Sequence, residues 1–152
     1  MFDTTFIGKR FPPFTIEVER TKLHEFALAI GATDPVYHSR QQARVAGYED
    51  VQMLPTMPAQ FEFWGNPGWM ERLREIGLNT TRMLHAEQEF EYLGEIRPGD
   101  VLSGITTVLD GKARHGLDMA ILETRYTNQR SEHVLTALTK LVVREVKSKL
   151  ES

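Results

Sequence analysis

Hydrophobic and polar residues follow different periods in the two halves of this chain. In the first half, apolar residues recur at the spacing of a helix, which predicts helical segments at 18–30, 41–46, 55–64 and 69–77. Gly31 follows the first segment, where a residue in the left-handed conformation commonly ends a helix. The segment 55–64 is apolar on most of its faces, so we expect it to be buried.

In the second half, apolar and polar residues alternate, which is the pattern of strands with one buried face. Short runs with turn and charged residues separate the strands, for example "RPGD" at 97–100. The predicted strands are 82–96, 101–111, 117–129 and 133–146, with a further strand near the N-terminus at 11–16. Helices followed by an antiparallel meander predict an α+β fold with the helices on one face of a sheet. An edge strand of this sheet would be free to pair with a second subunit.

Size and composition narrow the possible functions. A chain of 152 residues suits one domain, spanning 1–152, with a hydrophobic core of its own. The net charge is -3 and the sequence has no block of like charge, so nothing indicates nucleic-acid binding. The absence of cysteine excludes disulfides, a thiolate nucleophile and a zinc-thiolate site. The first residues lack the pattern of a signal peptide and no apolar run approaches the ~20 residues of a membrane span, so we expect a cytoplasmic protein.

The stretch "GATDPVYHS" at 31–39 is the candidate for chemistry, because it places an acid and a histidine in a tight loop between two predicted helices. Asp34 and Pro35 suit a turn, and Ser39 suits the N-cap of the second helix. Asp34 and His38 could act as an acid and base pair. Alternatively, Asp34 bonds to the nearby backbone in a turn and His38 is a solvated residue before a helix.

Four stretches of the chain have a distinctive sequence: "IGKRFPPFTIEVERTKLHEFALAIG", "MLPTMPAQFEFW", "MLHAEQEFEYLGEIRPGDVL" and "ETRYTNQ". Together they resemble the MaoC-like (R)-specific hydratases and dehydratases of the hot dog fold, in the branch described as FAS1-like dehydratases. The resemblance implies one hot dog domain, an antiparallel sheet wrapped around a central apolar helix. It also implies hydration of a trans-2-enoyl thioester of coenzyme A or acyl carrier protein, or the reverse dehydration. Such a reaction needs no metal or redox cofactor.

Catalytic members of this family carry a GDxNPxH loop, whose Asp transfers a proton and whose His holds the water. On that pattern Gly31 and Pro35 match, but Ala32 stands at the acid position and Tyr37 at the histidine position. An alanine methyl accepts no proton, and a tyrosine with an ordinary pKa near ~10 is a poor base at neutral pH. Catalytic members also tend to have His-Gly where "LPTM" begins the central helix here.

The resemblance therefore implies an accessory, catalytically degenerate subunit, with no catalytic residue expected on this chain. Its expected partner is a paralogous hydratase subunit with an intact loop. Two alternatives remain open: a self-sufficient homodimeric hydratase that uses Asp34 and His38, and a non-catalytic homodimer that binds an acyl thioester or another lipid-like ligand.

Four residues are candidates for binding the substrate: Tyr37, Thr56, Phe61 and Gln88. Phe61 could wall a tunnel for an acyl chain or simply belong to the core. Gln88 lies among apolar neighbours, so it needs a hydrogen-bond partner and could equally be structural. Strict alternation places Gln88 and His85 on opposite faces of their strand unless a bulge intervenes.

Overall fold

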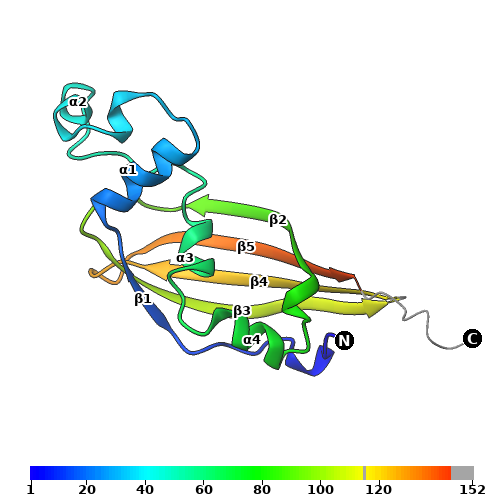
Figure 1. The fold of residues 1–152 in the computed structure, drawn as a ribbon. Helices are drawn as coiled ribbons and strands as arrows, with labels where there is room; N and C mark the ends of the chain where they lie inside the picture. The colour runs from blue at the N-terminus through cyan, green and yellow to red at the C-terminus, as the bar shows by residue number, and fades with distance from the viewer. Residues whose placement is uncertain (115, 145–152) are drawn as a thin grey trace, which may run out of the picture.

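The computed structural model describes residues 1–114 and 116–144 (Figure 1). Within them, a five-stranded antiparallel sheet has the strand order β1-β3-β4-β5-β2. The strands are β1 (Phe14–Glu17), β2 (Met83–Tyr92), β3 (Val101–Arg114), β4 (Leu117–Thr127) and β5 (His133–Arg144). The helices are α1 (Arg20–Ala29), α2 (Arg40–Val45), α3 (Ala59–Phe63) and α4 (Trp69–Glu75), with short 3-10 turns at Thr4–Phe6, Pro35–Tyr37 and Thr80–Arg82. The α+β class predicted from the sequence is confirmed.

Most predicted elements lie within a few residues of the observed ones. The first strand begins three residues later than predicted, because the backbone at 10–11 approaches β3 through an isolated bridge and one hydrogen bond before the regular pairing starts at Phe14. The strand β2 ends at Tyr92, four residues before its predicted end. The last strand is described to Arg144, so the final two residues predicted for it lie outside the described residues. No helix in 1–114 or 116–144 is both long and apolar enough to cross a membrane.

The central helix is shorter than the sequence pattern predicts. The segment 55–64 was expected to be helical throughout, but 55–58 forms a turn and α3 begins at Ala59. Pro55 and Pro58 explain the difference, because neither has an N–H to donate into a helix. The amides of Met57 and Phe61 instead bond to the carbonyl oxygens three residues before them, at 3.0 Å each.

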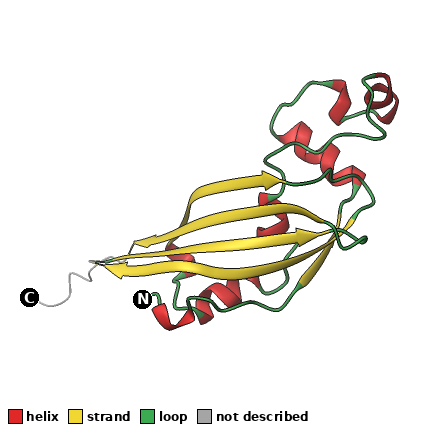
Figure 2. Ribbon diagram, turned by 180° about the vertical axis from the view of Figure 1, so that it is seen from behind, coloured by secondary structure: helices red, strands yellow, loops and turns green. Residues whose placement is uncertain are grey.

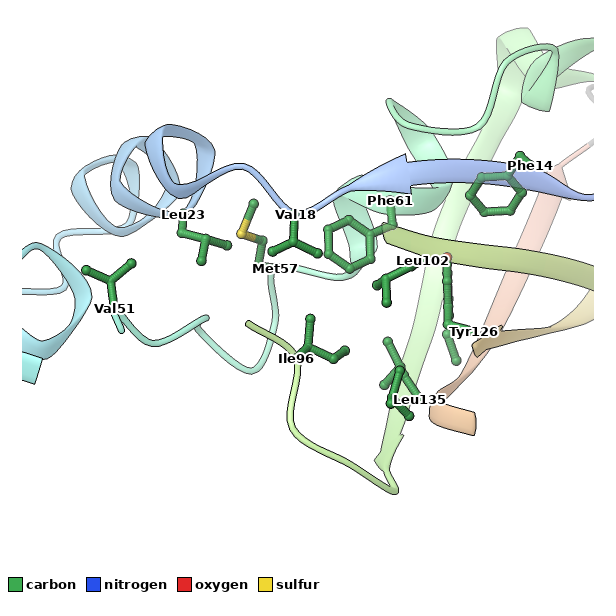
Figure 3. Packing of buried hydrophobic residues seen from close by; sticks show 12 residues of the cluster. Phe14, Val18, Leu23, Val51, Met57, Phe61, Ile96, Leu102, Tyr126 and Leu135 are labelled. Carbon is green, nitrogen blue, oxygen red and sulfur yellow. The ribbon is translucent and has the colours of Figure 1, made fainter. Parts of the chain in front are cut away.

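The helix α3 lies against one face of the sheet, and the core fills the space between them (Figures 1 and 3). Phe61 of α3 contacts Tyr126 of β4 with ring centroids 5.9 Å apart, and Phe14 of β1 meets the same tyrosine edge-on at 5.9 Å. Gly104 allows this contact, because a Cβ at that position would lie 2.5 Å from the Phe14 ring. Figure 2 shows the sheet from behind, where no helix of the described residues covers it.

The segment from α1 to Asp50 extends beyond one end of the sheet (Figure 1). One buried carboxylate joins its parts, because Asp50 accepts hydrogen bonds from Arg20 of α1 at 2.9 and 2.5 Å and lies 3.4 Å from Arg40 of α2. The amide of Val51 also donates to Asp50, at 2.8 Å. The ion pairs of Asp50 with Arg20 and Arg40 therefore link the two helices that flank the loop 31–39.

Candidate functional site

The loop between α1 and α2 starts at Gly31, whose φ of 71° is the left-handed conformation expected after a helix. Its acid is used locally. Asp34 Oδ1 accepts the backbone N–H of Val36 at 3.0 Å and so caps the 3-10 turn Pro35–Tyr37. This is the turn, with Asp34 bonded to the nearby backbone, that was one of the two alternatives predicted from the sequence.

The histidine of the loop is held on both sides of its ring. His38 Nε2 lies 2.6 Å from the carbonyl oxygen of Ala32, and its Nδ1 lies 3.0 Å from His24 Nδ1 on α1. A carbonyl oxygen only accepts, so Nε2 carries a proton. The other nitrogen either accepts from His24 or donates to it, and in both cases the two nitrogens of His38 are engaged within the chain. The expectation that His38 is a solvated residue is wrong, because it is partly buried against His24.

The geometry does not join the two residues of the alternative acid and base pair. Among the described hydrogen bonds of 31–39, none connects Asp34 to His38. The backbone carbonyl of Ala32 accepts the hydrogen bond from His38 Nε2, and the methyl side chain of Ala32 offers no second acceptor. Tyr37 is partly buried within the 3-10 turn, and its amide donates to the carbonyl of Asp34 at 3.1 Å.

The turn that precedes α3 is tied to the edge strand. The hydroxyl of Tyr92 on β2 donates to the carbonyl oxygen of Pro55 at 2.7 Å, and burial raises the pKa of this phenol to about 12. Thr56 follows on the turn and is exposed. The amide of Gln52 donates to Val36 at 3.0 Å, which connects the loop 31–39 to the same segment.

A bulge in β2 decides the placement of Gln88. The pairing with β5 shifts register between His85 and Glu87, and the side chains of His85 and Gln88 then meet, with Nε2 and Oε1 2.8 Å apart. Strict alternation would place His85 and Gln88 on opposite faces of β2, and the bulge brings them to the same face. His85 also lies beside the ring of Phe63 at 5.1 Å.

The side-chain amide of Gln88 also begins a buried chain of hydrogen bonds, which ends at the carboxyl group of Glu62. Thr139 Oγ1 lies 3.0 Å from Gln88 Oε1 and 2.5 Å from Glu62 Oε2 on α3. One hydroxyl has a single proton and cannot donate to both oxygens. With Gln88 Oε1 facing Thr139, a protonated Glu62 satisfies both contacts, because it donates to Thr139, which then donates to Gln88. With the amide turned, Gln88 Nε2 donates to Thr139, which donates to the Glu62 carboxylate. Glu62 is fully buried, and desolvation raises the pKa of its carboxyl group, which favours the protonated form.

A groove of about 340 Å³ lies between β1 and α3. Of the four predicted binding residues, all within the described chain, only Phe61 lines it. Met57 and Ile16 share its apolar wall, and Trp64 stands at the groove with 87% of its surface exposed. Trp64 is therefore not a core residue, whereas Trp69 is buried beside the rings of Phe11 and Phe63.

Comparison with known proteins identifies the family. The model for the family described as "FAS1-like, dehydratase domain region" matches residues 5–137. The chain belongs to this family. A UPF0336 protein of Streptomyces avermitilis is 36% identical over 143 residues, which cover 93% of this chain and 95% of that protein.

Two solved structures show that this FAS1-like dehydratase chain has the hot dog fold of MaoC-like proteins. The C-terminally truncated HadBC (3R-hydroxyacyl-ACP dehydratase) complex of Mycobacterium tuberculosis contains a chain with a TM-score of 0.76 and 22% identity, covering 90% of this chain and 96% of that one. The MaoC-like dehydratase of Rhodospirillum rubrum has a TM-score of 0.62 and 26% identity, covering 93% and 94%. The resemblance predicted from the sequence is confirmed.

Sequence reasoning missed three residues that organise this FAS1-like dehydratase site: His24, Asp50 and Glu62. Glu62 had a detectable signal, because it is an acid inside a segment expected to be buried on most faces. His24 and Asp50 had no such signal, because their partners are distant in the sequence. His24 is 14 residues from His38, and Asp50 is 30 residues from Arg20.

Proposed function

We propose that this chain is the accessory, catalytically degenerate subunit of an (R)-specific enoyl-thioester hydratase or 3-hydroxyacyl-thioester dehydratase. One observation carries the proposal: the loop at 31–39 keeps its bend, but its acid and its histidine are bonded within the chain. Asp34 caps a turn, and both nitrogens of His38 are engaged by His24 and Ala32. Asp34 and His38 are therefore not bonded to each other as an acid and base pair.

The partner in this proposal is a paralogous hot dog subunit with an intact loop. Its Asp and His would transfer the proton and hold the water at the reacting double bond. The likeness to a chain of the HadBC complex supports a two-subunit arrangement, because that complex is described as a 3R-hydroxyacyl-ACP dehydratase.

The part of this chain in the reaction is then to shape the path of the acyl thioester. We place the acyl chain along the groove that Phe61 and Met57 line, where burial of methylene groups favours binding by about 0.8 kcal/mol each. Tyr37 and Thr56 lie on the connected loop and turn, and Gln88 reaches the same helix through Thr139. The thioester is that of coenzyme A or of an acyl carrier protein.

The test is reconstitution of turnover from separate subunits. This chain and a paralogous subunit with an intact GDxNPxH loop are purified alone and together, and hydration of crotonyl-CoA is measured. We expect negligible turnover by this chain and full turnover only in the mixture. A chain that hydrates crotonyl-CoA alone, and loses that activity in the Asp34→Asn variant, would show that the homodimeric alternative is correct.

A further inference from the structure

The strand β2 forms one edge of the sheet, and within 1–114 and 116–144 no strand pairs with its outer side. Beyond the bulge its residues alternate between two faces. Gln88 and Phe90 are partly buried toward the helix, whereas Glu87, Glu89 and Glu91 are exposed on the other face. An edge strand is a template for pairing with another chain, so its side chains decide which chains can approach.

The acidic face of β2 is only partly neutralised by the neighbouring strand. Glu87 has a cation, because Lys140 Nζ lies 2.7 Å from its Oε1. Glu89 and Glu91 lie opposite Leu138 and Thr136 of β5, neither of which carries a charge.

The arginine on β4 that interacts with Glu91 is engaged elsewhere. Arg125 on β4 donates to Glu123 at 2.7 Å, and its electrostatic interaction with Glu91 is weaker than that with Glu123. Two carboxylates at the free edge therefore remain available to a chain that adds a strand there.

Self-pairing would set these acids against one another. A two-fold axis normal to the sheet keeps each face on its own side, so residues of the acidic face can only lie opposite residues of the same face. With Glu89 on the axis, it faces its own copy, and Glu87 faces Glu91 in both halves. Like charges directly opposite on antiparallel strands oppose pairing, since their Cβ atoms lie about 4.5–5.5 Å apart.

The ends of β2 nevertheless have the apolar surface of an interface. Leu84 is 63% exposed and Tyr92 is 41% exposed. We propose that β2 takes the edge strand of a paralogous hot dog subunit whose corresponding face carries Lys or Arg, and that Glu89 and Glu91 exclude a second copy of this chain. The inference rests on the proposed function for the identity of the partner, and adds the charge rule that selects it.

A charge-swap experiment tests the rule without any measurement of catalysis. The wild-type chain, the Glu87→Lys/Glu89→Lys/Glu91→Lys variant and an equimolar mixture of the two are compared by sedimentation equilibrium at low salt. We expect each protein alone to self-associate weakly, and the mixture to form a heterodimer at least about tenfold tighter, because Lys then lies opposite Glu. Added salt should weaken this gain, because exposed charges are screened.

Two further variants keep the result interpretable. Glu25→Lys/Glu71→Lys/Glu75→Lys makes the same change of charge on exposed residues of α1 and α4 and should give no gain when mixed with the wild type. Glu89→Gln/Glu91→Gln removes the repulsion and should self-associate more tightly than the wild type.

Wild-type self-association as tight as the mixture, or an equal gain with the variant of α1 and α4, would overturn the charge rule. If the charge swap succeeds but no paralogous subunit restores turnover, the rule stands and the proposed function fails. If turnover is restored but the swap has no effect, only the rule fails.

Discussion

Replacing Asp50 by Asn should loosen the segment that holds the loop 31–39. Its carboxylate is 11% exposed, and the Arg20 guanidinium beside it lowers the pKa of Asp50 from 3.8 to about 2. A difference of about 1.8 pKa units corresponds to roughly 2.4 kcal/mol at 1.36 kcal/mol per unit. Arg20 is 48% exposed and therefore partly screened by water. We expect the variant to lose about 1–2 kcal/mol of unfolding free energy at neutral pH.

The pH dependence of this loss has a definite sign. A lowered pKa means that the folded state prefers the carboxylate, so the stabilisation is complete above 3.8 and is lost as the pH falls toward about 2. Urea unfolding across this range should show the wild type and Asp50→Asn converging in acid. Glu25→Gln is the matched control on α1, because Glu25 forms an exposed pair with Lys22 and should change stability by less than about 0.5 kcal/mol. An Asp50→Asn variant as stable as wild type at neutral pH would refute the anchoring role.

Three other variants test separate parts of the structure by urea unfolding. Glu62→Gln should stabilise the protein at neutral pH: the raised pKa means that wild-type stability is greatest below 4.5 and declines as the pH rises above it, whereas the variant should lack this decline. Gly104→Ala should cost about 1–3 kcal/mol, because its Cβ meets the Phe14 ring, and no loss would contradict the tight packing. Asp34→Ala should cost about 1 kcal/mol through loss of the turn cap; a loss of turnover in the reconstituted complex that exceeds this destabilisation would argue for a chemical role.

Periodicity in the sequence was sufficient for the sheet and for the order of the helices. Alternation located β2 to β5, because one face of each strand is more buried than the other, most regularly in β3 and β4. The same pattern extended the central helix too far, since a hydrophobic count does not register the missing amides of Pro55 and Pro58.

The site was only partly predictable. Ala32 and Tyr37 could be read directly from the sequence, because the resemblance places them at two defined positions of a short loop. The pairing of His24 with His38 could not, because it depends on how the loop folds back on α1. The contact of Gln88 with His85 required a bulge, which shifts side chains between faces without a distinct sequence signal.

The most direct test of the central claim is inactivation of one subunit at a time in the reconstituted complex. Hydration of crotonyl-CoA is measured with the loop acid of the partner changed to Asn, and separately with Asp34→Asn in this chain. The account predicts a loss of about 10²–10⁴-fold for the change in the partner, the usual contribution of a general acid or base, and near wild-type turnover for the change in this chain. A comparable loss from Asp34→Asn, with the complex still assembled, would contradict it.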